Sequence, residues 1–244
     1  MQTSEKSQPV FNIPMTILII VAGLAVIHGL RTHVFSYETN LDIILQFSFI
    51  PARYDNAMFI EFSPAARWWS PVTYSFLHAD WTHFLVNSLW LVVFGAVVAR
   101  RLGPVRFLAL CLVGSLGGAA AHYLTNMGST IPTVGASAVV SACVGASTRF
   151  AFQSGIGISE LDNHRPRLSL METFTNRQTF AFIGIWFLVN YLSGVGFSEL
   201  SADGGGIAWE AHIGGFLAGL LLFPLFDPVK PGGNDWDYSS DQAA

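Results

Sequence analysis

The sequence predicts an all-α membrane protein, a six-transmembrane-helix bundle with a structured first external loop. Of its 244 residues, 52% are hydrophobic and only 11% are charged, and the mean hydropathy is +0.47. Soluble domains carry about 25% charged residues, so this chain has too few charges to cover a globular surface. Separate apolar stretches, each long enough to cross a bilayer, complete the prediction.

A bilayer core requires about 20 mostly apolar residues per helix. The stretches that meet this length are Asn12–Leu30, Thr82–Leu102, Val105–Leu124, Val134–Phe152, Gln178–Phe197 and Ile207–Phe226. The first follows a polar segment that lacks the basic region and cleavage site of a signal peptide, so we expect it to remain as a span. Residues 1–11 are expected to be a cytosolic N-terminal segment, 12–226 one membrane domain and 227–244 a polar, disordered tail.

The first loop, between residues 31 and 81, has features of a folded element. Its apolar runs Leu41–Ile50 and Ala57–Phe62 are too short to cross a membrane. Near its end, Arg67–Trp69 is an aromatic cluster of the kind found at membrane interfaces. We therefore expect this loop to lie partly in the outer leaflet.

Arginine placement predicts the orientation of the spans. Arginines gather between the second and third spans and around the connection from the fourth to the fifth, whereas Thr125–Thr133 and Ser198–Gly206 carry neither Lys nor Arg. The first loop does hold arginines, but long loops weigh less in the positive-inside rule. We expect a multi-pass protein of a bacterial inner membrane with both termini in the cytosol.

Several function classes are disfavoured. The chain has a net charge of −4 and no basic face, so nucleic-acid binding is not expected. Cys111 and Cys143 both lie in apolar stretches, where free thiols are more often packing residues. Neither has a second Cys or His at ligand spacing, so no metal and no cofactor are expected.

Polar residues occur at a similar depth in three of the predicted spans. Ser137 and His212 lie near the outer ends of the fourth and sixth, and His83 and Asn87 near the outer end of the second. Ionisable groups within a membrane are rare and usually functional, because a charged side chain costs roughly 2.5–3.5 kcal/mol on insertion scales. Serine with histidine is the minimum set for acyl transfer, with His212 as the general base.

The predicted second span also carries groups that can stabilise an oxyanion. His83 and Asn87 are four residues apart and therefore share one helix face. Their N–H groups and the backbone N–H of Ser137 can donate to a developing negative charge. Each residue also has a structural alternative: Ser137 as a packing residue, His212 bonded to a carbonyl, and Asn87 as an interhelical hydrogen-bond residue.

Three segments carry a resemblance to the rhomboid intramembrane serine proteases. They are Phe76–Asn87 (FLHADWTHFLVN), Gly135–Ser137 (GAS) and Ala211–Gly219 (AHIGGFLAG). Each is weak alone, but their order on the second, fourth and sixth spans is specific. The resemblance extends from Trp69 to about Phe226. It implies a rhomboid-like bundle that cleaves single-span membrane proteins within the bilayer.

By that resemblance Ser137 is the nucleophile and His212 the base, with His83 and Asn87 as oxyanion donors and no third acid. Glycines near the site are Gly135, Gly215 and Gly219, and the last two form a small face that lets the sixth span approach the fourth. The chain departs from the family where Ala138 replaces a usual glycine and where Ser141 replaces a frequent aromatic residue. It departs a third time in the first loop, where Trp69–Ser70 takes the place of a Trp-Arg pair and Arg67 lies only nearby.

Two other functions remain as alternatives. A rhomboid-like protein that binds transmembrane clients without cleaving them is favoured by Ala138 and opposed by the complete set of site residues. A small-solute transporter predicts inverted repeats and broken midplane helices, which the sequence does not display. His78 is interpreted as structural, and Glu210 as a residue that points away from His212. The aromatic run Phe180–Phe187 is expected to face lipid.

Overall fold

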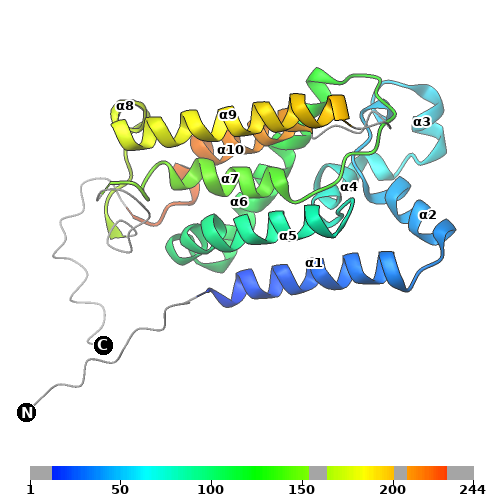
Figure 1. The fold of residues 1–244 in the computed structure, drawn as a ribbon, viewed down its shortest axis with the longest axis horizontal. Coiled ribbons are helices and arrows are strands. Elements are labelled where there is room, and N and C mark those ends of the chain that lie inside the picture. Colours follow the sequence, from blue (N-terminus) through cyan, green and yellow to red (C-terminus); the bar gives the residue numbers. More distant parts are fainter. Residues whose placement is uncertain (1–12, 154–163, 201–207, 230–244) are drawn as a thin grey trace, which may run out of the picture.

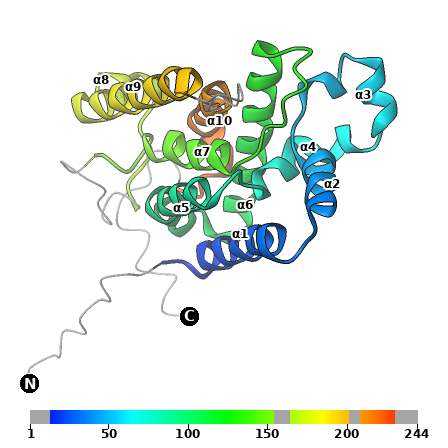
Figure 2. The same ribbon diagram turned by 45° about the vertical axis from the view of Figure 1, so that its right-hand side comes forward.

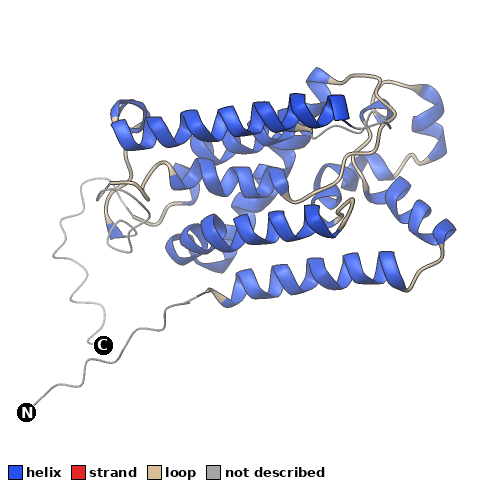
Figure 3. Ribbon diagram, in the orientation of Figure 1, coloured by secondary structure: helices blue, strands red, loops and turns tan. Residues whose placement is uncertain are grey.

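A computed structural model describes residues 13–153, 164–200 and 208–229. In this part of the chain the secondary structure is helical, apart from one isolated bridge between Phe49 and Thr133 (Figure 3). The elements are α1 (Met15–His33), α2 (Tyr37–Phe47), η1 (Pro51–Arg53), α3 (Ala57–Phe62), α4 (Ala66–Thr73), η2 (Tyr74–Phe76), α5 (Trp81–Trp90), η3 (Leu91–Gly95), α6 (Ala96–Thr125), α7 (Ser137–Ser147), α8 (Leu170–Thr175), α9 (Arg177–Leu200) and α10 (Trp209–Phe226). The all-α prediction is confirmed.

The long helices lie along one common axis (Figure 1). Among the described residues, three helical stretches are long and apolar enough to cross a membrane: Met15–His33, Trp81–Thr125 and Trp209–Phe226. The start of α1 and the end of α10 lie at the same end of the bundle, on the left of Figure 1. The chain is thus an integral membrane protein by its helices, while the count of six spans stays a prediction.

The stretch Trp81–Thr125 contains a sharp reversal. Gly103 has φ 72° and ψ 168°, and Pro104 follows it. Positive φ is accessible to glycine at little cost, and proline suits the first turn of the helix that starts next. The break coincides with the gap predicted between Leu102 and Val105. It turns the chain back into the bundle, where α6 packs against α7 and α10.

The fourth predicted span is shorter than expected. The sequence predicts a helix over 134–152, but α7 contains 11 residues, from Ser137 to Ser147. Gly135 has φ 132° and Ala136 has ψ 0°, so the backbone is not helical before Ser137. Every residue of α7 from Val140 onward is buried. It is a central core helix, and in Figure 2 it lies between α5 and α10.

Small residues allow α6, α7 and α10 to pack at very short range. A Cβ added at Gly219 of α10 would lie 2.0 Å from the carbonyl oxygen of Ala142 on α7. One added at Gly114 of α6 would lie 2.5 Å from the Ala142 Cβ. Because neither position tolerates a side chain, α7 is held between two glycine-bearing faces.

The first loop is folded against one end of the bundle, on the right of Figure 1. It contains α2, α3 and α4, and the Trp69 Nε1–H donates to the carbonyl oxygen of Gln46 at 2.9 Å. The Tyr74 hydroxyl donates to the carbonyl oxygen of Ser115 on α6 at 2.9 Å. The first bond joins α4 to α2 within the loop, and the second fixes the loop to α6. Its location in the outer leaflet stays a prediction.

The expectation for Phe180–Phe187 is wrong in part. Phe180 and Ile185 are exposed, but Trp186 is only 8% exposed and stacks on Phe216 of α10 with ring centroids 4.7 Å apart. Phe187 contacts the same ring edge-on. In a run of apolar residues the sequence does not indicate which face of the helix packs against a neighbouring helix and which faces lipid. One side of α9 therefore packs on α10.

Candidate active site

Ser137 is the first residue of α7, and the segment before it is tied to the first loop. The Gly135 N–H donates to the carbonyl oxygen of Tyr74 at 3.0 Å, and Thr133 pairs with Phe49. The first N–H groups of a helix have no partner within it, and this end of the helix carries partial positive charge. The half-buried Ser137 thus lies where the backbone favours a developing anion.

Gly135 has two reasons to be glycine. Its φ of 132° is unfavourable for other residues, and a Cβ there would lie 2.8 Å from His83 Nε2 and 3.6 Å from Ser137 Oγ. The missing side chain lets the imidazole of His83 lie against the chain just before Ser137. His83 is itself held in the first turn of α5, where its N–H donates to Asp80 Oδ1 at 2.8 Å.

His212 lies in the first turn of α10, beside the start of α7. A Cβ at Gly118 of α6 would meet both the Ala138 Cβ at 2.4 Å and the Ala211 carbonyl oxygen at 2.9 Å. The residue after Ser137 and the residue before His212 therefore contact the same glycine. The rings of His212 and His83 are also close enough for their charges to interact. The structure brings Ser137, His83 and His212 to one end of the bundle.

Asn87 is buried one turn after His83, on the same helix. Its Nδ2 donates to the carbonyl oxygen of His83 at 3.0 Å. The amide group is thus turned toward its own backbone, and its second N–H bond remains for another acceptor. A role for Asn87 at an oxyanion stays a prediction.

His78 and Glu210 have structural surroundings. The His78 ring is fully buried, with its centroid 5.3 Å from that of His83, and burial lowers its pKa to about 3. Its backbone carbonyl accepts from Arg31 Nη1 at 3.1 Å. A carboxylate oxygen of Glu210 lies 3.9 Å from Nδ1 of His122 on α6. Because His78 stays neutral, it is unsuited to proton transfer near neutral pH.

The departures at Ala138 and Ser141 are accommodated locally. The Ala138 methyl packs against Gly118, where α6 has no side chain. The Ser141 hydroxyl donates back to the carbonyl oxygen of Ser137 at 2.7 Å. The Ala138 methyl group therefore occupies the space that Gly118 leaves open in the core. The Ser141 hydroxyl is hydrogen-bonded within its own helix.

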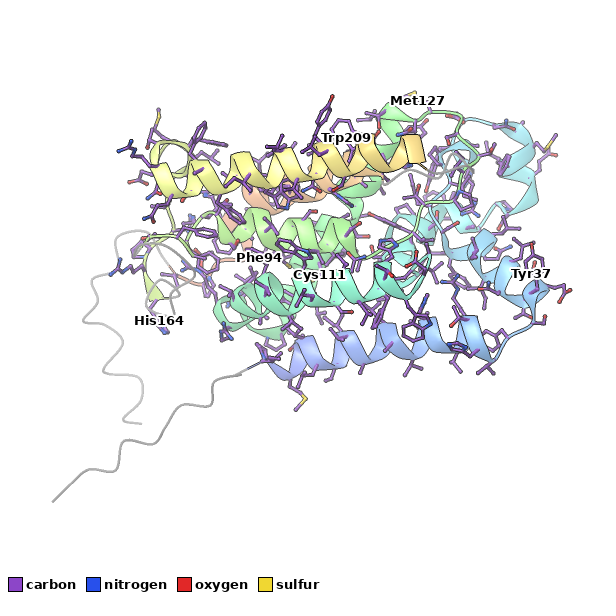
Figure 4. The ribbon with its side chains drawn as sticks, in the orientation of Figure 1. Tyr37, Phe94, Cys111, Met127, His164 and Trp209 are labelled. Atoms are coloured by element: carbon purple, nitrogen blue, oxygen red, sulfur yellow. The ribbon has the colours of Figure 1, made fainter. Side chains whose placement is uncertain are left out.

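Sequence reasoning missed Asn190 on α9. Its Oδ1 lies 2.7 Å from Nδ1 of His212. The available signal was an isolated amide in an apolar span, where an unpaired polar group is costly. Figure 4 labels Trp209 at the start of α10, where Tyr191, next to Asn190, meets its ring edge-on.

Comparison with known proteins agrees with this architecture. A Rhomboid domain matches residues 65–227, which is more than half of the chain. The chain therefore belongs to the rhomboid family.

Two plant proteins from Arabidopsis thaliana are similar in sequence. RHOMBOID-like protein 5 is 28% identical over 169 residues, covering 67% of this chain and 47% of that protein. RHOMBOID-like protein 9, chloroplastic, is 35% identical over 82 residues, covering 34% of this chain and 18% of that protein. The chain thus aligns with less than half the length of these relatives. Because both are plant proteins, they give no support for a bacterial origin.

Proposed function

We propose that this chain is an intramembrane serine endopeptidase that cleaves single-span membrane proteins near the outer end of the substrate helix. Membership of the rhomboid family, which generally comprises serine proteases, supports this function. The observation that carries the proposal is the close packing of α7 on α10. That packing sets Ser137 and His212 at the starts of adjacent helices, with His83 beside them.

In the proposed mechanism the Ser137 Oγ attacks the carbonyl carbon of the scissile peptide bond while His212 Nε2 takes the hydroxyl proton. The tetrahedral intermediate collapses, the carbon–nitrogen bond breaks, and the same proton passes to the leaving amine. Water then hydrolyses the acyl-enzyme with His212 again as the base. General base catalysis of this kind contributes about 10²- to 10⁴-fold.

The oxyanion of the intermediate would form at the start of α7. Backbone N–H groups there, the imidazole N–H of His83 and the second N–H of Asn87 are the available donors. Removal of one such donor costs about 2.7–4 kcal/mol in serine proteases. The positive end of α7 adds to this stabilisation, because the charge develops within its first turn.

The position of the candidate site along the bundle supports cleavage near one membrane surface. The starts of α7 and α10 lie at the end of the bundle that carries the first loop (Figure 1), so cleavage takes place near that surface. By the arginine distribution this is the outer face, with α1 starting and α10 ending on the cytosolic side. A site near the surface also gives water access, which hydrolysis requires.

The alternative is a rhomboid-like protein that binds transmembrane clients without cleaving them. Ala138 was the residue that favoured it, because a methyl group in a tight contact can separate Ser137 from His212. The contact of that methyl group with Gly118, which has no side chain, argues against such a displacement and supports the protease. The protease is therefore the function that we propose.

The experiment is cleavage of a single-span test substrate, with small residues near the outer end of its helix, in proteoliposomes of the purified protein. Wild type is expected to release two fragments, and Ser137→Ala and His212→Ala none. Binding of the substrate without cleavage by a well-folded wild type would support the client-binding alternative instead.

A further inference from the structure

The amide of Asn190 has one possible orientation. Its Nδ2 donates to the carbonyl oxygen of Trp186 at 2.8 Å, four residues earlier on α9. Reversal of the amide would place its oxygen against that carbonyl oxygen, which is repulsive. Oδ1 therefore faces His212, at 2.7 Å from Nδ1.

This contact determines the tautomer of His212. An amide oxygen can only accept a hydrogen bond, so Nδ1 must carry the proton. In the neutral ring Nε2 then has a free lone pair, which is the form that a general base requires. The bond also stops the ring from rotating about its χ angles. A histidine without such a partner populates both tautomers and several orientations.

The bond replaces a contact that position 141 does not provide. Ser141 has no ring to pack under His212, and its hydroxyl is bonded to the Ser137 carbonyl oxygen. Asn190 contacts His212 from α9 instead of from α7. Its half-buried side chain lies on the face of α9 that packs on α10, one turn after Trp186 and Phe187, whose rings contact Phe216. The close stacking of Trp186 on Phe216, with ring centroids 4.7 Å apart, sets the separation at which the amide can reach His212.

We propose that Asn190 is a positioning residue that holds His212 in the tautomer and orientation needed to accept the Ser137 proton. This role rests on the proposed protease function. In soluble serine proteases a buried carboxylate does the same for the catalytic histidine, and disturbing the tautomer lowers kcat by about 10⁴-fold. A neutral amide stabilises the protonated ring less than a carboxylate does, so its removal has a smaller effect.

Among the residues that the structure describes, few charged or titratable groups lie near His212. His83 of α5 is within electrostatic range. Glu210, on α10 itself, is directed to His122 of α6. The side chains of α9 that contact α10 in this region are Trp186, Phe187 and Asn190, which do not titrate, and Tyr191, whose ring meets Trp209. α7 presents Ser137. A carboxylate at position 190 would therefore be a new charge in contact with the ring.

The test compares Asn190→Leu and Asn190→Asp with Phe187→Leu, a control that alters the same helix interface without touching His212. Asn190→Leu is expected to lower kcat and the rate of labelling by a fluorophosphonate about 10- to 100-fold, with KM within twofold. Phe187→Leu should stay within about threefold of wild type. Asn190→Asp keeps the acceptor, so it should retain activity at high pH. The acid limb of its pH–activity profile should move to higher pH, because the new carboxylate stabilises the protonated ring of His212.

Nitrogen-15 NMR of histidine-labelled protein gives a readout that does not depend on activity. The His212 signal, assigned by its loss in His212→Gln, should show a protonated Nδ1 in wild type and in Asn190→Asp, and mixed tautomers in Asn190→Leu. Equal activity of Asn190→Leu and Phe187→Leu would overturn the positioning role of Asn190. If Asn190→Leu does not fold, the deciding variant is Asn190→Asp, and an acid limb of its pH–activity profile at the wild-type position would overturn the role. A wild type that has the Nδ1-protonated ring but neither labels nor cleaves would refute the protease function and not the hydrogen bond.

Discussion

The most informative single substitution is Gly219→Ala, because it tests whether the spacing of two helices sets activity. An added Cβ at Gly219 would lie 2.0 Å from the Ala142 carbonyl oxygen, whereas ordinary contacts begin at 3.4 Å. The backbone oxygen cannot rotate away, so α7 and α10 must separate by about 1.0–1.4 Å to lengthen that contact to 3.0–3.4 Å. Gly219 lies about two turns from His212 and does not touch the reacting atoms. Any loss of activity therefore reports the spacing.

The expected loss follows from this displacement. A misplacement of about 1 Å between reacting groups costs on the order of 10²-fold in rate. Forcing an extra methyl group into a packed core also costs roughly 1–3 kcal/mol of stability. The matched control is Gly184→Ala on α9, because a Cβ at Gly184 would meet no atom within 4 Å. We expect that control to cleave at a rate within twofold of wild type.

The assay is kcat/KM for a single-span substrate in proteoliposomes, with thermal unfolding measured on the same samples. Gly219→Ala should be folded, less stable than Gly184→Ala, and about 100-fold slower. If a folded Gly219→Ala cleaves as fast as Gly184→Ala, the spacing of α7 and α10 does not control the reaction, and the reasoning from their contact is refuted.

Other substitutions test separate parts of the site. Asn87→Ala should lower kcat by about 10²- to 10³-fold with little change in melting temperature; a large drop in melting temperature with unchanged kcat would favour a packing role. Ala138→Gly should change kcat/KM by less than about threefold, because Gly118 already accommodates the methyl group; a large gain would show that Ala138 impairs the site. His78 is neutral when folded but takes up a proton below pH 6.5 when unfolded, so wild type should lose stability as the pH falls from 6.5. Melting curves of His78→Phe should show a smaller loss of stability over this pH range than those of wild type. An identical pH dependence in the two proteins would contradict the assignment of this loss to His78.

The sequence predicts those features of the fold that depend on local composition. Apolar length locates α1, α9 and α10 to within a few residues, and the gap between the predicted spans that end at Leu102 and begin at Val105 locates the reversal at Gly103. The short α7 could not be predicted in this way. Its start depends on the backbone of Gly135 and Ala136, which the first loop and His83 hold in place.

The candidate site was predicted to the extent that its residues belong to recognisable motifs. Ser137, His83 and His212 lie in segments that resemble one family, and their shared depth follows from topology. Asn190 lies in no motif, and its pairing with His212 depends on which face of α9 packs against α10. That face is determined by Trp186 and Phe187 against Phe216, contacts between residues far apart in the sequence.

The measurement that tests the proposed function most directly is fluorophosphonate labelling of the purified, detergent-solubilised protein, with the modified residue located by mass spectrometry. We expect one adduct, on Ser137, and we expect His212→Ala to abolish it without unfolding the protein. A folded wild type that takes up no label, or that takes it up equally well without His212, would contradict an activated serine at the start of α7.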